Sequence, residues 1–370
     1  MLTGMFELHR TTPNARIGTL TTPHGDLPTP FFMPIATKAA VKTLSSADIE
    51  KLGSPIVLSN TYHLMLRPGM DVMKQVGGLH RFMGWNGAIL TDSGGYQVLS
   101  LSNLRKVTEE GVTFSSPING DKHTLTPESS IDIQRTIGSD IVMCFDELID
   151  LPATRGQIYE AAERTTRWAK RCKDRFEATR EGAINPNAQL FGIIQGGTYP
   201  ELRKKSAEDL LAIGFDGYAI GGIVADKTFE SALDALDWII PLLPEDKPRY
   251  FMGGALPEQI VQYAKHGIDM FDCVLPTRNA RHGHLYRWVH SDLSRPDFYE
   301  TINITNAKWR GSDEPLVDRK GVSGFDDELS RFTMGYLHHL FDTEEMLAFR
   351  LATIVNVSFY LELFQRLRKG

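Results

Sequence analysis

The sequence predicts an α/β fold, a (β/α)8 TIM barrel, and two observations lead to that prediction. Eight short apolar runs recur between residues 31 and 277, and each ends in a polar or glycine-rich turn. Most of the intervals between the runs are long enough to hold a helix. Continuous apolar strands that alternate with helices indicate a parallel sheet with both faces covered. Eight such units within about 250 residues are typical of a closed barrel.

The expected elements follow one another along the chain. The strands are FFMPIAT (31–37), PIVLSN (55–60), AILTDSGG (88–95), DIVMCFDE (140–147), LFGIIQGG (190–197), YAIGG (218–222), RYFMGG (249–254) and MFDCVLPT (270–277). The helical patterns are Ser129–Ile137, Gln157–Arg175, Pro200–Ile213, Phe229–Leu243 and Pro257–Lys265. The alternative is a doubly wound open sheet, which often has a phosphate-binding glycine turn after its first strand. Here that strand runs into ATKAAVKT, which lacks such a turn, so the barrel is favoured.

Segments outside the eight units complete the predicted organisation. Residues 6–30 are expected to form a small antiparallel hairpin that covers the barrel bottom, so that 1–283 is the barrel with its N-terminal hairpin. Residues 284–335 are polar and irregular, and 284–343 are expected to form a C-terminal insertion subdomain that includes a helix over Arg331–Phe341. A last helix, Glu344–Arg368, is expected to return to the barrel within 344–370.

Composition narrows the class of protein. A net charge of −6 argues against a protein that coats nucleic acid indiscriminately, although it allows one nucleic-acid-binding face. No apolar run approaches the roughly 20 residues of a membrane span, and no signal peptide is read at the start. The three cysteines, Cys144, Cys172 and Cys273, have no metal-ligand spacing, which favours a reducing cytoplasm.

Polar residues at the expected strand ends predict the functional site, because the C-terminal ends of barrel strands form the active-site mouth. These ends carry Asn60, Asp92, Asp146, Gln195, Gly221, Gly222, Gly253, Gly254 and Asp272. Each aspartate alone has an ordinary explanation, a cap on the helix that follows. Three carboxylates together with two side-chain amides are more typical of a functional site than of helix caps alone.

The chemistry of the mouth follows from its residue types. His282 and His284 stand in a polar loop and are more typical of solvated side chains than of metal ligands. Two aspartates from different strands can take separate roles in a substitution at a sugar carbon. One forms a covalent intermediate with the sugar, and the other donates and accepts protons. An ionised Asp146 offers only acceptors and therefore suits an N–H-rich edge.

A flat ligand is indicated by TDSGGYQ (91–97). Gly94 and Gly95 have no Cβ and allow a planar group to lie against the backbone, and Tyr96 is placed to stack on it. The alternative is a tight turn beside a core tyrosine. The neighbouring Asp272 and Gln195 favour a site for a planar heterocycle.

Five segments resemble the signature blocks of bacterial-type tRNA-guanine transglycosylases, the queuine tRNA-ribosyltransferase family. They are TDSGGYQVLSL, GSDIVMCFDE, LFGIIQGG, GFDGYAIGG and GIDMFDCVLPTRNARHG. The resemblance covers nearly the whole chain and implies the same barrel fold. It also implies exchange of the wobble guanine of tRNA for a 7-deazaguanine base, as a step of queuosine formation.

The resemblance implies a role for individual residues. Asp272 matches the nucleophile that attacks the ribose C1′, and Asp92 matches the general base. The substrate-binding positions are Ser93, Gly94, Gly95, Tyr96, Asp146, Gln195, Gly221 and Gly222. The RNA-contacting positions are Gly253, Gly254, Leu256 and Pro257, and the loop Thr277, Arg278, Asn279, Ala280 and Arg281.

Two basic clusters are candidates for RNA contact. The first, beside the expected nucleophile, comprises Arg278, Arg281, His282, His284 and Arg287. Because phosphate contacts supply most nucleic-acid affinity, this cluster is expected to contact the anticodon loop. The second comprises Lys170, Arg171, Lys173 and Arg175 and is more typical of a solvated helix face.

The chain departs from the family at the structural zinc, which family members bind through C-x-C-x-x-C and a later histidine. The matching positions fall near Gly324, Asp326 and Leu329, and the histidine position is Val355. We therefore expect no metal and no cofactor, with Leu329, Phe332 and Val355 packing in place of the zinc.

Two further departures lie near the pocket. Ala225-Asp226-Lys227 replaces a Val-Gly-Glu, and the lysine would repel the aminomethyl cation of preQ1 (7-aminomethyl-7-deazaguanine). Ala225 in place of valine would also widen the pocket, and the two changes together suggest a different or bulkier base such as queuine. Gly254-Ala255-Leu256 replaces a Gly-Lys-Pro-type turn, which weakens one expected RNA contact.

The sequence therefore predicts a cytoplasmic pentosyltransferase that acts on the tRNA anticodon loop and a 7-deazaguanine base, preQ1 or queuine. It is expected to form a homodimer, or a heterodimer with a related subunit, and not to bind membranes. The alternatives are a non-catalytic tRNA-binding partner subunit and base exchange on another nucleic acid such as DNA.

Overall fold

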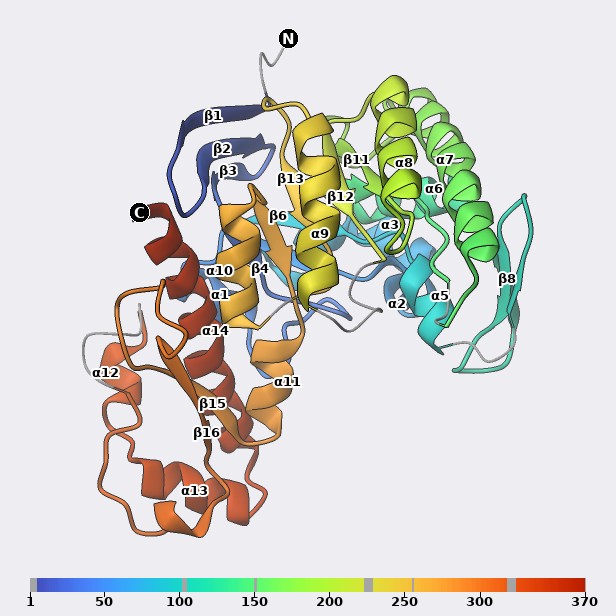
Figure 1. Cartoon of the computed structure of the whole chain (residues 1–370). Helices are drawn as coiled ribbons and strands as arrows, with labels where there is room; N and C mark the ends of the chain where they lie inside the picture. Colours follow the sequence, from blue (N-terminus) through green and yellow to red (C-terminus); the bar gives the residue numbers. More distant parts are fainter. Residues whose placement is uncertain are drawn as a thin grey trace.

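The computed structural model describes residues 5–101, 105–149, 152–222, 229–254, 256–317 and 324–369. Its centre is an eight-stranded parallel sheet in the order β4-β14-β13-β12-β11-β10-β6-β5. The strands are β4 (Phe31–Met33), β5 (Ile56–Ser59), β6 (Ala88–Thr91), β10 (Ile141–Met143), β11 (Gln189–Ile194), β12 (Gly217–Ile220), β13 (Arg249–Phe251) and β14 (Met270–Asp272). A parallel bridge between Ile35 and Leu58 joins the two ends of this order. The predicted barrel and all eight of its strands are confirmed (Figure 1).

Alternation along the strands builds two apolar layers. Phe31 and Met33 face the barrel interior, whereas Phe32 between them packs with the surrounding helices. Successive side chains of a strand point to opposite faces, and here both faces are buried. This is why the strands appear in the sequence as continuous apolar runs.

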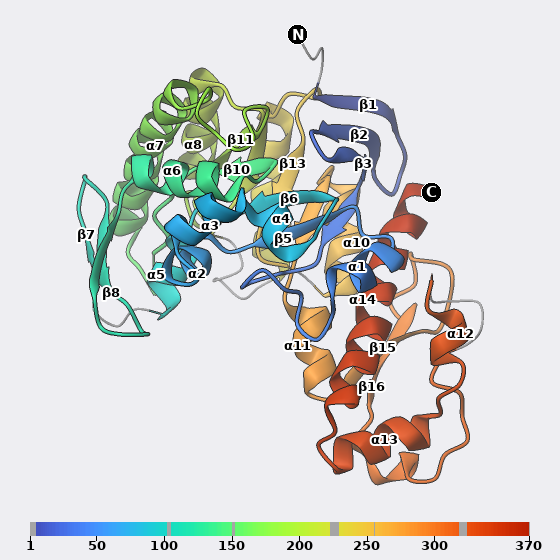
Figure 2. The ribbon, with the colours of Figure 1, turned by 180° about the vertical axis from the view of Figure 1, so that it is seen from behind.

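Helices connect the strands, and most of them pack around the outside of the barrel (Figures 1 and 2). They are α1 (Ser46–Lys51), α2 (Thr61–Leu66), α3 (Met70–Val76), α4 (Leu79–Met83), α5 (Gly95–Leu101), α6 (Pro127–Ile137), α7 (Arg155–Ala178), α8 (Pro200–Ile213), α9 (Phe229–Ile239), α10 (Pro257–Lys265) and α11 (Leu275–Arg281). Helices α8 and α10 have the predicted bounds. Helix α9 ends four residues before the predicted Leu243 and passes into the 3-10 turn Ile240–Leu242. Pro241 explains this end, because proline lacks the N–H that an α-helix interior requires.

The N-terminal cover is a three-stranded antiparallel sheet, so the prediction of a simple hairpin was wrong in strand number. Its strands are β1 (Phe6–Thr11), β2 (Arg16–Thr22) and β3 (Gly25–Thr29). Phe6, Leu20 and Leu27 are buried with the side chains of the barrel interior. The sheet therefore closes the bottom of the barrel, as expected.

A second small sheet was not predicted. It consists of β7 (Arg105–Val107), β8 (Val112–Ser115) and β9 (Lys122–Leu125), between α5 and α6. Figures 1 and 2 show it projecting from the side of the barrel opposite the C-terminal helices. The strands are short and mostly polar, so their sequence carries little of the alternation that marks a strand.

The C-terminal region is more regular than expected. It contains the antiparallel pair β15 (His284–Trp288) and β16 (Tyr299–Asn303), the 3-10 turn Ala307–Trp309, α12 (Asp326–Leu329), α13 (Met334–Asp342) and α14 (Met346–Lys369). Helix α14 runs from this region back along the barrel and packs against α10, α11 and β4 (Figures 1 and 2). The buried Asn356 joins these parts, because its side chain bonds the backbone of Tyr286, Pro276 and His284.

Helix α14 also bears on the membrane question. By length and composition alone it is apolar enough to cross a membrane, which the sequence reading did not anticipate. In the structure, however, 78% of its apolar window is buried inside the protein. The helix therefore serves as a core helix that the barrel and the C-terminal region share.

Candidate active site

Asp272 is the last residue of β14 and is only 7% exposed. Its Oδ1 atom accepts hydrogen bonds from the Tyr250 hydroxyl at 2.6 Å and from the Gly253 N–H at 2.9 Å. No bond to Oδ2 is seen among the described residues. Burial raises the pKa of Asp272 above its usual value, against the lowering effect of the two donors. The carboxylate is thus held by one oxygen and leaves the other for a ligand.

Asp92 follows β6 and is bound through both of its oxygens. Oδ1 accepts the Thr61 N–H at 2.8 Å, and Oδ2 accepts the Asn60 side-chain amide at 2.5 Å. Asp92 therefore caps α2 rather than α5, the helix that follows it in the chain. Burial raises its pKa to about 6, and the nearby charge of Asp272 adds to that rise. A group with this pKa exchanges protons readily near neutral pH.

Asp146 forms the second part of the site with residues from two other strand ends. Its Oδ1 accepts the Ser93 hydroxyl at 2.9 Å, and its Oδ2 accepts the Gln195 side-chain amide at 2.8 Å. Burial raises the pKa of Asp146 to about 6. Both of these described donors are neutral, so neither of them compensates the negative charge of the carboxylate. That charge can therefore attract an N–H-rich ligand.

Glycines bring the backbone close to this group. A Cβ on Gly95 would lie 2.7 Å from the Asp146 carbonyl oxygen, and one on Gly222 would lie 2.3 Å from the Gln195 side-chain oxygen. Gly222 also has φ +71°, a conformation that favours glycine. Tyr96, on α5, is 60% exposed, as a stacking cover requires. The structure therefore brings Ser93, Gly95, Asp146, Gln195, Gly221 and Gly222 together, whereas Gly94 lies against Leu125 and Tyr62 and Tyr96 remains exposed.

The predicted RNA loop, residues 277–281, lies within helix α11, so its assignment as a loop was wrong. Leu275-Pro276 starts this helix, and proline is favoured in a first turn. Within it Thr277 and Ala280 are buried, whereas Arg278 is exposed. Asn279 donates to the Tyr286 hydroxyl at 2.6 Å. Arg278 and the following His282 are therefore the exposed basic groups at this end of the helix.

The turn after β13 supports Asp272 directly. Gly253 supplies one of the donors to its carboxylate, and a Cβ on Gly254 would lie 2.2 Å from that of Cys273. Leu256 is 40% exposed, and Pro257 is buried in the first turn of α10. Ala255 and Ala225-Asp226-Lys227 lie outside the described residues.

Ion pairs with acidic side chains engage one residue of the first basic cluster and all four residues of the second. Arg287 pairs with Glu300 and Glu314, so its expected place in a free basic cluster is corrected. All four basic residues of the second cluster pair with acids: Lys170 with Asp174, Arg171 with Glu128, Lys173 with Glu177 and Arg175 with Asp132. These pairs support the interpretation as a solvated helix face.

The residues that are expected to match the family's zinc ligands do not fit a zinc ion. Leu329 is fully buried and Val355 is 8% exposed within the apolar core. Gly324 packs against the Lys51 carbonyl, where a Cβ would lie 2.2 Å away. Asp326 is the only one of the four with a side chain that can bind zinc, and a structural site requires four ligands.

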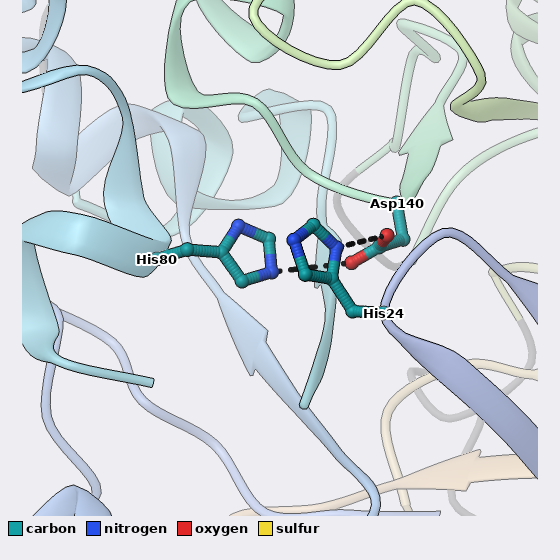
Figure 3. A group of neighbouring side chains, drawn as sticks. All are labelled: His24, His80 and Asp140. Atoms are coloured by element: carbon teal, nitrogen blue, oxygen red, sulfur yellow. Dashed lines mark hydrogen bonds and ion pairs between the residues drawn. The ribbon is translucent and has the colours of Figure 1, made fainter. Parts of the chain in front are cut away.

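A different group of metal-binding residue types lies at the barrel bottom, where His24 and His80 contact Asp140 (Figure 3). The two imidazole rings are stacked with centroids 3.7 Å apart and planes inclined by 16°. An imidazole binds a metal in the plane of its ring, so two nearly parallel stacked rings cannot both reach one ion. The nitrogens instead bond the carboxylate, with His24 Nδ1 2.7 Å from it.

Sequence reasoning missed two supporting residues. Tyr250 was read only as part of a strand, although its hydroxyl contacts the predicted nucleophile. Arg203 is fully buried and donates to the carbonyl oxygens of Gly197 and Ile194, on either side of Gln195. The sequence offered one signal for Tyr250, because a tyrosine at an inward position of the strand next to that of Asp272 can reach the carboxylate. No sequence pattern indicated the role of Arg203.

The chain matches known proteins over nearly all of its length. The family model described as queuine tRNA-ribosyltransferase matches residues 11–370. Proteins with that name from Methylobacillus flagellatus and Francisella tularensis subsp. novicida are 49% and 46% identical to it. Each of these alignments covers 99% of this chain, with 93% and 94% of the respective relative. A third, from Desulforamulus reducens, is 45% identical over 96% of this chain and 90% of the relative. On these matches, the chain belongs to the queuine tRNA-ribosyltransferase family.

Proposed function

We propose that this protein exchanges the wobble guanine of tRNA for a 7-deazaguanine base through a covalent intermediate on Asp272. One observation carries the choice of nucleophile. Asp272 is held through one oxygen, whereas both oxygens of Asp92 are engaged by Asn60 and Thr61. A hydrogen bond withdraws electron density from the oxygen that accepts it, so the Asp272 oxygen without a donor among the described residues is the better nucleophile.

The proposed reaction has two steps. Asp272 Oδ2 attacks the ribose C1′, the C1′–N9 bond breaks, and guanine leaves with the electron pair. The leaving base takes a proton from Asp92, whose pKa of about 6 suits donation and acceptance near neutral pH. The incoming base then loses its N9 proton to Asp92 and attacks C1′, which releases the Asp272 carboxylate.

Recognition of the base is assigned to the second group. Asp146 accepts from the N–H edge of a guanine-like ring, Gln195 and Gly222 line that edge, and Tyr96 covers the ring. The tRNA anticodon loop is placed against α11, where Arg278 and His282 are exposed. The inserted base is preQ1 or queuine, and Ala225, which is smaller than the family's valine, favours the bulkier queuine. Preferential use of preQ1 would contradict that choice.

We further propose that the protein works in the cytoplasm without zinc, as a homodimer or with a related subunit. The packing of Leu329 and Val355 supports the absence of the metal. Elemental analysis of the purified protein tests this directly. A stoichiometric zinc content would contradict it.

The test of function is incorporation of labelled guanine into unmodified tRNA, with Asp272→Asn as the control. Exchange by the parent, together with a denaturation-stable adduct between protein and tRNA, is expected, and the variant should show neither. tRNA binding without exchange would point to a partner subunit, and exchange confined to DNA would identify another substrate.

A further inference from the structure

We infer that Tyr250 is a positioning residue for the nucleophile, which fixes the oxygen of Asp272 that attacks and stabilises the carboxylate. The inference rests on the proposed role of Asp272. The Tyr250 hydroxyl lies 2.6 Å from Oδ1, the same atom that the Gly253 N–H reaches at 2.9 Å. Two donors from one strand and its turn therefore converge on one oxygen.

Strand register explains how Tyr250 reaches the site. β13 and β14 are neighbours in the barrel, and Tyr250 pairs with Met270. Met270 and Tyr250 both face the barrel interior, and Asp272, two residues after Met270, points to the same side. A long side chain on the inward face of β13 thus reaches the end of the neighbouring strand.

The environment keeps the phenol a donor. Tyr250 is 1% exposed, and burial raises its pKa well above the usual value, with the charges of Asp272 and Asp92 acting in the same direction. A tyrosine that stays protonated donates to the carboxylate at every pH at which the enzyme works. Hydrogen bonds to a charged acceptor are stronger than those between neutral groups.

The two donors act in both chemical steps. In the free enzyme they stabilise the ionised carboxylate, and because both bind Oδ1, Oδ2 is the oxygen that can face the ribose. In the ribosyl ester, Oδ1 becomes the carbonyl oxygen, and the same donors withdraw electron density from it. They thereby make Asp272 a better leaving group when the incoming base attacks C1′.

The competing explanation is that Tyr250 only fills the barrel interior. Phenylalanine would fill the same space, so the hydroxyl separates the two explanations. For Tyr250→Phe we expect kcat to fall roughly tenfold to a hundredfold with the KM for guanine unchanged. The acid limb of the pH profile for formation of the protein–tRNA adduct should move upward by about one pH unit, since the attacking carboxylate loses a donor.

Two further proteins make the experiment decisive. Tyr218→Phe is the matched control, because Tyr218 is a buried tyrosine of the neighbouring β12 whose hydroxyl contacts the Phe215 N–H instead. Fluorotyrosine at position 250 keeps the size of the ring and donates more strongly, so it should move the acid limb downward. This measurement remains informative if Tyr250→Phe folds poorly.

The outcomes separate the inference from the proposed function. An unchanged kcat and pH profile in Tyr250→Phe, or an unmoved acid limb with fluorotyrosine, would overturn the role of Tyr250 while exchange by the parent upheld the function. Equal losses in Tyr250→Phe and Tyr218→Phe would likewise reduce Tyr250 to a packing residue. A parent protein that performs no exchange would overturn both.

Discussion

The two ends of the barrel surround their carboxylates with opposite kinds of partner. At the bottom, Asp140 contacts His24 and His80, and Asp269 contacts the guanidinium of Arg16 at 3.3 Å. At the mouth, the described donors to Asp92, Asp146 and Asp272 are hydroxyls, side-chain amides and backbone N–H groups, all of them neutral.

This difference separates carboxylates that hold the fold together from those available for chemistry. Burial alone does not distinguish them, because it raises the pKa of Asp269 to about 6 even beside Arg16. The partner of the carboxylate distinguishes the two groups. A neighbouring cation neutralises the charge within the fold. Neutral donors hold the carboxylate in place and leave its charge free to interact with a ligand. Four substitutions or titrations test the contrast.

The largest effect is expected from Asp92→Asn at the mouth. Loss of the proton-transfer group should lower kcat by about 100- to 10,000-fold. In the parent, the rate of the second step should rise with pH through about 6 as Asp92 loses its proton, and the variant should lack this rise. The free energy of unfolding should change by no more than about 1 kcal/mol, because the lost hydrogen bond is offset by removal of a half-buried charge. A large loss of stability with normal turnover would instead place Asp92 among the structural carboxylates.

The opposite pattern is expected from Asp269→Asn at the bottom. The substitution leaves Arg16 and Arg249, which are both buried, without the negative charge between them. The free energy of unfolding should fall by about 3–5 kcal/mol, while the activity of the folded fraction stays at the parent value. Asp26→Asn, at an exposed position of β3, is the control. Chemical denaturation measures the effect, and a loss of turnover without loss of stability would break the contrast.

An intermediate effect is expected from Asp146→Asn. An amide in place of this carboxylate removes a charged acceptor from the base edge, so the KM for guanine should rise roughly tenfold to a hundredfold. Asp216→Asn provides the control, since Asp216 accepts the Leu190 N–H outside the site. Equal base affinity in the parent and in Asp146→Asn would show that another residue reads the ring.

The smallest effect is expected from titration of His24. The hydrogen bond to Asp140 raises the His24 pKa above 6.5, so its contribution to stability is full below that pH and is lost as pH rises through the raised pKa. For Asp140 burial acts to raise the pKa, but the bonds from His24 and His80 outweigh it and lower the pKa. Its contribution is therefore present above its ordinary pKa of 3.8 and is lost as pH falls through the lowered one.

The size of this effect is limited because the His24 side chain is 33% exposed. We expect the free energy of unfolding to differ by at most about 1 kcal/mol between pH 5.5 and pH 8 on this account. The difference should disappear in His24→Asn. A pH dependence that persists in the variant would assign the titration to another group.

The sequence by itself determined the barrel and the composition of its mouth. Strand position and polar strand ends are local properties, written in apolar runs and in the residues that follow them, such as Asp92 and Asp272. The bounds of Pro200–Ile213 and Pro257–Lys265 were also local, because a proline starts each helix, whereas α6 starts at Pro127, two residues before its predicted start.

Only the tertiary structure decided which groups meet. Asp92 caps α2 across a neighbouring strand, Tyr250 bonds Asp272 from β13, and Arg287 is neutralised by Glu314 from a distant turn. These contacts join residues separated by 22 to 31 positions in the chain, so no local pattern encodes them. The free energy of a carboxylate depends on its burial and its partners, and both are fixed only when the strands close into a barrel.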